Sequence, residues 1–144
     1  MERAEKVVVD ASVIVKWYNV EDYTENALAL RGDYASRRLD LIAPHLVVYE
    51  VGNSLRYNPD FGADDVKSAL RDLLAMQINL RLLDEEISEV AVDLAYKFGI
   101  TFYDAVYLTL AEKEKAPLYT ADERLLLKIE NENIKHIGEY KASV

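Results

Sequence analysis

The chain contains no cysteine among its 144 residues. It therefore has no disulfide, no zinc–thiolate site and no thiol nucleophile, and the cytoplasm is the default location. No apolar run approaches the roughly 18 residues that a transmembrane helix needs. The charged stretch Met1 to Lys6 leaves no room for the apolar core of a signal peptide. We expect a single globular domain over residues 1–144 that is cytoplasmic and does not associate with a membrane.

Positive charge is also scarce, because 17 Lys and Arg residues face 26 Asp and Glu residues, for a net charge of −9. Proteins whose main task is to grip nucleic acid are usually basic, so the overall charge counts against such a partner. A divalent-metal site offers another interpretation, since it needs several carboxylates and the ion then meets the phosphate. Phosphate contacts would then come from local basic residues, and the candidates near the motifs are Lys16, Arg56, Lys113 and Arg124. For each of them a solvated helix face is the simpler interpretation.

Short apolar segments with strand character alternate with longer segments of helical periodicity. The expected strands are Lys6–Asp10, Leu39–Ala43, Leu80–Leu83, Pro117–Thr120 and Ile134–Ile137. The expected helices are Ser12–Tyr18, Asp22–Arg38, His45–Tyr57, Ala63–Met76, Glu85–Phe98 (with Gly99 as its C-terminal cap), Asp104–Lys115 and Asp122–Glu130. The alternation predicts an α/β fold of three layers, α/β/α, with a central, mostly parallel sheet of about five short strands.

Two aspartates lie where a strand gives way to a helix. Asp10 ends the first strand, and Asp122 follows the strand Pro117–Thr120. A parallel sheet brings such positions to one edge, and ligands bind at the carboxyl ends of its strands. Capping of the following helix is the simpler alternative for both residues. Thr120 has a hydroxyl that could orient a carboxylate or a bound water.

Two further acids lie on expected helices. Glu50 interrupts an apolar stretch, and Asn53 follows it on the same helix face. Asp104 opens a helix, where it could pair with Thr101 in a variant of the capping box. An exposed glutamate and a simple cap are the alternatives. If the four acids converge, their mutual repulsion calls for a cation, and carboxylate and water oxygens suit Mg²⁺ or Mn²⁺.

Four segments together carry a family resemblance: Val7–Ser12 (VVVDAS), Tyr49–Leu55 (YEVGNSL), Thr101–Leu108 (TFYDAVYL) and Tyr119–Leu126 (YTADERLL). In their order and spacing the chain resembles the PIN-domain family, specifically the stand-alone VapC-type toxin ribonucleases. The resemblance spans nearly the whole chain. It implies that the catalytic and metal-binding residues are Asp10, Glu50, Asp104 and Asp122, and that Ser12, Asn53 and Thr120 support them.

The same resemblance implies an endoribonuclease that depends on Mg²⁺ or Mn²⁺ and acts as the toxin of a toxin–antitoxin pair. Its expected partners are an RNA substrate, a cognate antitoxin protein that blocks the site, and a second copy of the chain in a homodimer. Trp17, Tyr18 and Tyr23 are expected in the core, although an exposed subset would suit an antitoxin groove.

Two alternatives remain open at the level of sequence. One is a catalytically silent PIN-fold interaction module. The other is a phosphotransfer domain of similar layout, although a phosphatase of the haloacid-dehalogenase type would need an aspartate where Ser12 stands. Histidine-based ribonuclease chemistry is disfavoured, because His45 and His136 are the only histidines and structural roles explain them.

Overall fold

The computed structural model describes residues 4–142 and contains a sheet in the order β3-β2-β1-β4-β5. All neighbouring strands run parallel. The strands are β1 (Glu5–Val9), β2 (Leu39–Pro44), β3 (Asn79–Arg81), β4 (Leu118–Thr120) and β5 (Ile134–His136). The predicted α/β fold is therefore confirmed, and the sheet is parallel throughout.

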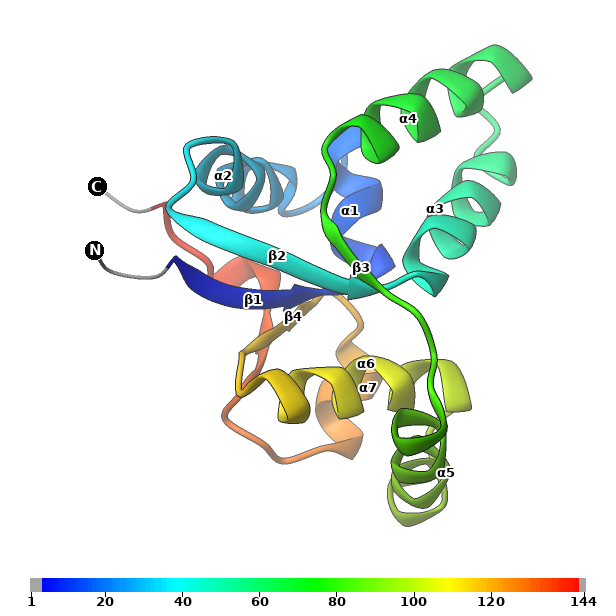
Figure 1. Cartoon of the computed structure of the whole chain (residues 1–144). Helices are drawn as coiled ribbons and strands as arrows, with labels where there is room; N and C mark the ends of the chain where they lie inside the picture. Colours follow the sequence, from blue (N-terminus) through cyan, green and yellow to red (C-terminus); the bar gives the residue numbers. More distant parts are fainter. Residues whose placement is uncertain (1–3, 143–144) are drawn as a thin grey trace.

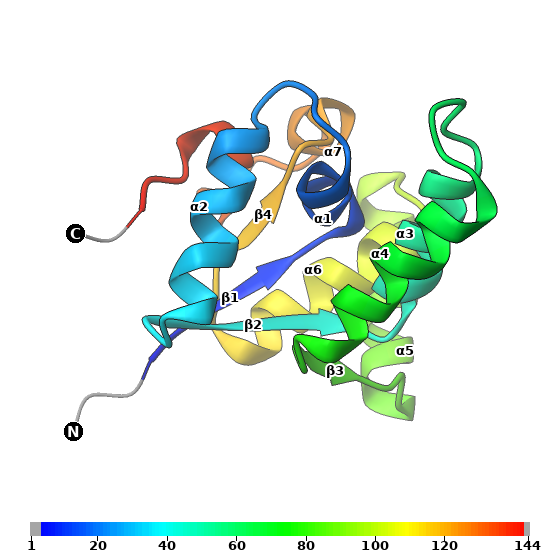
Figure 2. The same ribbon diagram turned by 90° about the horizontal axis from the view of Figure 1, so that it is seen from above.

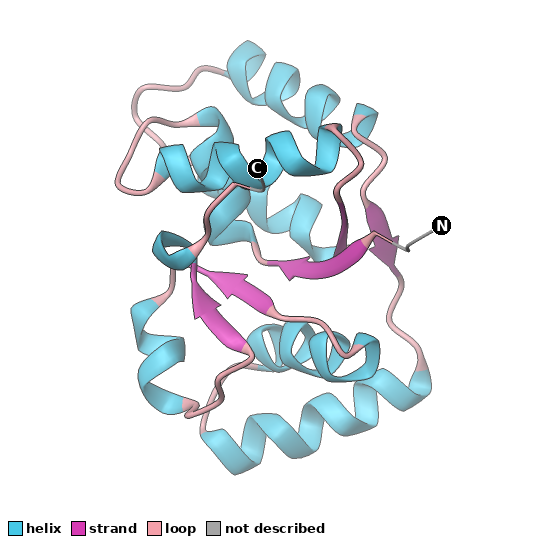
Figure 3. Ribbon diagram, turned by 90° about the vertical axis from the view of Figure 1, so that its left-hand side faces the viewer, coloured by secondary structure: helices cyan, strands magenta, loops and turns pink. Residues whose placement is uncertain are grey.

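Helices cover both faces of the sheet, as Figure 1 and, from the side, Figure 3 show. One layer contains α1 (Ala11–Tyr18), α2 (Thr24–Ala35), α3 (Leu46–Arg56) and α4 (Ala63–Ala75), which overlie the strands in Figure 2. The other layer contains α5 (Glu85–Phe98), α6 (Phe102–Glu114) and α7 (Glu123–Lys128). A short 3-10 turn, Ile137–Glu139, packs against α2. Within residues 4–142, no helix is both long and apolar enough to cross a membrane.

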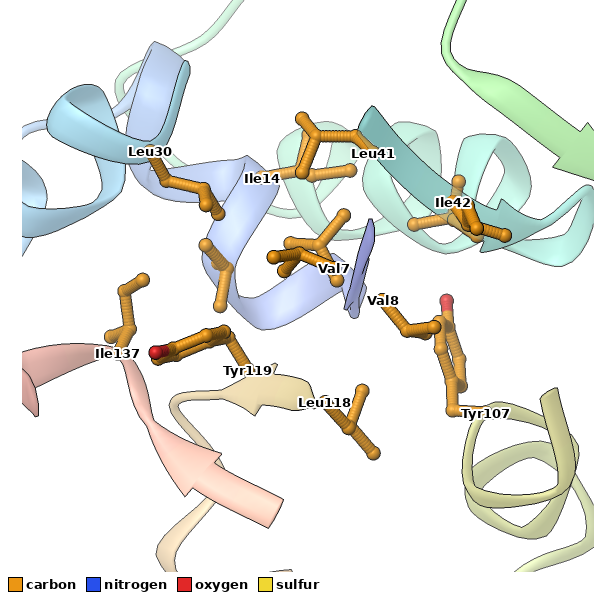
Figure 4. Packing of buried hydrophobic residues seen from close by; sticks show 14 of the residues in the cluster. Val7, Val8, Ile14, Leu30, Leu41, Ile42, Tyr107, Leu118, Tyr119 and Ile137 are labelled. Carbon is orange, nitrogen blue, oxygen red and sulfur yellow. The ribbon is translucent and has the colours of Figure 1, made fainter. Parts of the chain in front are cut away.

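The central strand β1 explains the apolar run at the start of the chain. Val8 and Val9 are completely buried, because β1 lies between β2 and β4 and has helices on both sides. Figure 4 shows Val7 on the side of Ile14 and Val8 on the side of Tyr107. Successive side chains thus enter opposite halves of the core, as the two-residue period of a strand requires.

Among the strands, the largest boundary error concerns the third, predicted at Leu80–Leu83 but found at Asn79–Arg81. Leu82 and Leu83 are 75% and 54% exposed, so their apolar character does not mark a buried strand. The helix predicted at Asp22–Arg38 also extends beyond the observed one, which spans Thr24–Ala35. The predicted helix at Asp104 begins earlier, at Phe102, because Thr101 is its cap and accepts a hydrogen bond from the Asp104 N–H at 3.0 Å. Gly99 ends α5 with a φ of 63°, as predicted.

The strand order reverses between β1 and β4. From β1 the chain builds outward through β2 and β3, then returns to the other side of β1 for β4 and β5. Folds of this kind bind ligands outside the carboxyl ends of the strands at such a reversal. Asp10 directly follows β1, and Asp122 lies two residues beyond β4. The topology therefore brings these two acids to the edge where a site is expected.

Candidate active site

Asp10 is the most enclosed acid at this edge, with 8% of its surface exposed. It caps α1, because its carboxylate accepts the Ser12 N–H at 3.0 Å, so the capping interpretation is correct. The Ser12 hydroxyl also hydrogen-bonds to the same carboxylate oxygen. Burial raises the pKa of Asp10 to about 6, although hydrogen bonds from Ser12 and Thr120 partly oppose the shift. Capping alone leaves this buried charge unneutralised.

Two hydroxyls link the end of β1 to the end of β4. Ser12 Oγ accepts the Ala121 N–H at 2.8 Å and lies 3.4 Å from Thr120 Oγ1. Thr120 Oγ1 in turn accepts the Asp122 N–H at 3.0 Å. The Asp122 carboxylate caps α7, accepting the Arg124 N–H at 3.0 Å, as the capping alternative predicts. The hydrogen bonds of Ser12 and Thr120 therefore fix the position of Asp10 relative to Asp122.

Glu50 is half-buried on α3 and is not the plain exposed glutamate of the simpler interpretation. Its Oε1 accepts a hydrogen bond of 2.6 Å from the Tyr107 hydroxyl. Burial raises the pKa of Glu50, the Tyr107 hydrogen bond opposes this, and the charge of Asp104 adds to the rise. Glu50 is thus within electrostatic reach of an acid on the opposite side of the sheet.

Asp104 connects the four acids electrostatically. Its own pKa is raised by burial, which the hydrogen bond with Thr101 opposes, and the charge of Asp122 raises it further, whereas Lys128 lowers it. The charge of Asp104 also raises the pKa of both Asp10 and Glu50. Each of the other three acids therefore interacts with Asp104, which lies in the first turn of α6.

Three of the four acids line two surface clefts, and Asp10 lines neither. A cleft of about 500 Å³ contains Asp104 and Asp122 together with Arg124 and Lys128. A second cleft, of about 450 Å³, contains Glu50, Ser12 and Lys16. Lys16 is buried there and forms an ion pair of 2.9 Å with Glu21. The basic groups that share a cleft with one of the acids are thus Arg124 and Lys128 on one side and Lys16 on the other.

The other polar residues singled out from the sequence lie away from these clefts. Arg56 lines a separate hollow between α3 and α4 and lies over the Tyr57 ring. Lys113 pairs with Asp84 at 3.8 Å. Asn53 is exposed on α3 and lines neither cleft.

Two residues beside the acids, Lys128 and Tyr107, were not predicted from the sequence. Lys128 follows Arg124 by four positions, and Tyr107 follows Asp104 by three. Helical spacing places the members of each pair on one helix face, so this signal was present in the sequence.

The donor chemistry of the site fits a divalent cation. Asp10, Glu50, Asp104 and Asp122 offer only carboxylate oxygens, which suit Mg²⁺ or Mn²⁺. The raised pKa values of Asp10, Glu50 and Asp104 indicate negative charge that the surrounding protein leaves incompletely balanced. The acids do not form a closed cage as placed, since no three His, Asp or Glu side chains between residues 4 and 142 are grouped to hold a metal ion.

Comparison with protein families shows where this arrangement belongs. The family model described as "PIN domain" matches residues 7–131. The chain belongs to the PIN-domain family. PIN-domain nucleases generally use divalent metal ions, in agreement with the carboxylate oxygens that the four acids offer.

Two relatives of this PIN domain are named VapC nucleases. Ribonuclease VapC3 of Pyrobaculum aerophilum is 35% identical over 124 residues, which cover 83% of this chain and 92% of that protein. Exonuclease VapC9 of the same organism is 33% identical over 112 residues, which cover 77% and 84%.

Solved structures agree with this assignment. The crystal structure of PAE2754 from P. aerophilum is similar with a TM-score of 0.65 and 27% identity, covering 93% of this chain and 90% of that one. A chain in a toxin–antitoxin complex from Klebsiella pneumoniae shares the fold with a TM-score of 0.63 and 16% identity, covering 83% and 89%.

Proposed function

We propose that this chain is a single PIN domain that acts in the cytoplasm as a divalent-metal-dependent endoribonuclease, the toxin of a toxin–antitoxin pair. The observation that carries the proposal is the electrostatic coupling of Asp104 to the three other acids beside the strand-order reversal. The names of the relatives, ribonuclease and exonuclease, support phosphodiester hydrolysis as the reaction.

Asp10 and Asp104 are our first choices as direct ligands of Mg²⁺ or Mn²⁺, because Asp10 is the most buried acid and Asp104 interacts with the other three. Glu50 and Asp122 would bind directly or through water. When bound by these residues, the ion would supply Lewis acidity toward a phosphate oxygen and a nearby water. Ser12 and Thr120 keep Asp10 in place through hydrogen bonds.

The chain's own residues would move the proton and orient the substrate. Glu50 or Asp122 would accept the proton of the attacking water as a general base. In-line attack on phosphorus would then break the bond to the 3′ oxygen, which takes up a proton from solvent water, and leave a 5′-phosphate and a 3′-hydroxyl. This route does not use the 2′-hydroxyl, so the choice of RNA rests on the relatives named as ribonucleases.

The proposed partners follow from the family and from the surface beside α1. The toxin–antitoxin complex with the same fold supports an antitoxin partner, and we also propose a homodimer. Trp17 is buried, as predicted, and donates its indole N–H to the Ala27 carbonyl at 2.8 Å. Tyr23 is 47% exposed and packs against His136, so it is the aromatic residue of this group that an antitoxin could contact.

The test is cleavage of a total-RNA pool with Mn²⁺ or Mg²⁺, with all cut ends mapped, for wild type and Asp104→Asn in parallel. We expect discrete internal cuts with 5′-phosphates that disappear in the variant and in EDTA. Progressive trimming from an end would instead indicate an exonuclease. Mn²⁺ binding without any cleavage would favour the silent interaction module. Phosphoryl labelling of the protein would favour phosphotransfer, which membership of the PIN family already makes the weaker alternative.

A further inference from the structure

Tyr107 connects the two helical layers at the active site. It belongs to α6 on one side of the sheet, and its hydroxyl donates a 2.6 Å hydrogen bond to Glu50 Oε1 on α3, which covers the other side. Its side chain is 3% exposed and lies beside Val8 of β1, as Figure 4 shows. A buried polar contact across a sheet is maintained only where the surrounding packing holds both partners.

The hydrogen bond has a definite direction. A phenol has an ordinary pKa of about 10, so Tyr107 is neutral at pH 7. Its O–H is therefore the donor, and Oε1 of the Glu50 carboxylate is the acceptor. A backbone hydrogen bond with Ala11 acts on the same hydroxyl, so the ring is also connected to the first residue of α1.

The bond uses one oxygen of Glu50 and leaves the other available. Within the described part of the chain, Oε2 of Glu50 accepts no hydrogen bond. A free glutamate side chain samples several rotamers and loses that freedom when it binds a ligand. A hydrogen bond that already holds Oε1 removes part of this cost.

We propose that Tyr107 is a positioning residue for the metal site: it holds Oε1 of Glu50 so that Oε2 is presented to a divalent cation or to a water bound to it. This inference rests on the proposed function, because it assigns a role within the same carboxylate group. Tyr107 itself touches neither substrate nor cation. Its effect on the site passes entirely through Glu50 and through the backbone at Ala11.

A purely structural role is the competing explanation, and the chain offers a matched control for it. Tyr140 is also buried and hydrogen-bonds through its hydroxyl to the carboxylate of the buried Asp33. Asp33 lies in α2 and Tyr140 follows the 3-10 turn, and neither lines the clefts beside the acids. Each substitution thus removes one hydrogen bond from a buried tyrosine hydroxyl to a carboxylate. Tyr107→Phe removes it beside the proposed metal site, and Tyr140→Phe removes it away from that site.

The experiment is calorimetric titration of Mn²⁺ into wild type, Tyr107→Phe and Tyr140→Phe at one fixed pH. Loss of a partner that orients a metal ligand weakens metal binding by roughly 10- to 100-fold, and we expect a loss of this size for Tyr107→Phe alone. Unchanged affinity in Tyr107→Phe, or an equal loss in Tyr140→Phe, would overturn the inference. Wild type that does not bind Mn²⁺ would refute the metal-dependent function and the inference with it.

A second measurement needs no substitution and covers the case in which Tyr107→Phe does not fold. Wild type is labelled with ¹³C at tyrosine Cζ and titrated with Mg²⁺. Because the Tyr107 hydroxyl bonds directly to Glu50, we expect its Cζ resonance to move on saturation while that of Tyr140 stays in place. A Tyr107 resonance that does not respond to bound Mg²⁺ would refute the positioning role.

Discussion

The Ser12 hydroxyl accepts the backbone N–H of Ala121 at 2.8 Å. Ser12 lies in the first turn of α1, which follows β1, whereas Ala121 directly follows β4. The two strands are neighbours in the sheet, and this hydrogen bond connects them where the strand order reverses. Because the same hydroxyl hydrogen-bonds to Asp10, one small side chain both orients a buried acid and joins the two halves of the site.

Replacing Ser12 by alanine should therefore destabilise the protein. The Ala121 N–H and the Asp10 carboxylate each lose a partner, and an unsatisfied buried polar group costs about 1–3 kcal/mol. Urea unfolding of Ser12→Ala measures the loss directly. Ser68→Ala, at an exposed position of α4, is the control and should stay within about 0.5 kcal/mol of wild type. Equal stability of Ser12→Ala and wild type would show that the bond contributes little.

The stability of the metal-free protein should rise as the pH falls from 8 to 5. Burial raises the pKa of Asp10 in the folded protein to about 6, from the ordinary 3.8 that it has in the unfolded chain. Above pH 6 the group is ionised in both states and the folded state carries the cost of burying it, on the order of 3 kcal/mol. Between about pH 6 and 3.8 the folded state binds a proton that the unfolded state does not, so this cost disappears.

Melting temperatures in EDTA, measured across this pH range for wild type and Asp10→Asn, test this prediction. The raised pKa values of Glu50 and Asp104 act in the same direction. Asp10→Asn should be less sensitive to pH than wild type, because it lacks the largest of these contributions. Parallel curves for the two proteins would show that Asp10 does not titrate as described.

Asp104→Asn should raise the melting temperature of metal-free protein and reduce its stabilisation by Mn²⁺. The substitution removes the charge that interacts with the other three acids. It should also weaken Mn²⁺ binding, and a ligand that binds the folded state less tightly stabilises it less. Thermal unfolding with and without Mn²⁺ measures both effects. Asp93→Asn, on the exposed side of α5, should change neither. Equal Mn²⁺ stabilisation of Asp104→Asn and wild type would exclude Asp104 as a ligand.

Asp10→Asn should abolish RNA cleavage while leaving the fold intact. Asparagine keeps the size of the side chain and an oxygen that can accept the Ser12 N–H, so α1 retains its cap. Circular dichroism should match wild type while mapped cleavage disappears. Undiminished turnover would remove Asp10 from the mechanism.

Lys128→Gln should weaken RNA binding more than it slows the chemical step. Lys128 lines the cleft with Asp104 and Asp122, and its ammonium group donates to the Gly99 carbonyl at 2.9 Å. If it contacts one phosphate, its loss should reduce the slope of log affinity against log salt by about 1. Filter binding of RNA in Ca²⁺ across a salt series measures this slope. Lys97→Gln, an exposed lysine on α5 outside the cleft, should keep the wild-type slope.

The local sequence was sufficient to predict which segments are strands and where Asp10 and Asp122 lie, because apolar periodicity marks buried strands and a parallel sheet aligns their carboxyl ends. The local sequence did not predict where the edge strand β3 ends, because Leu82 and Leu83 are apolar like buried strand residues but are exposed. Only the tertiary structure decided that Glu50 is held by Tyr107, a residue 57 positions away. Periodicity describes one element at a time, whereas this contact depends on how two helices from opposite layers meet at the end of β1.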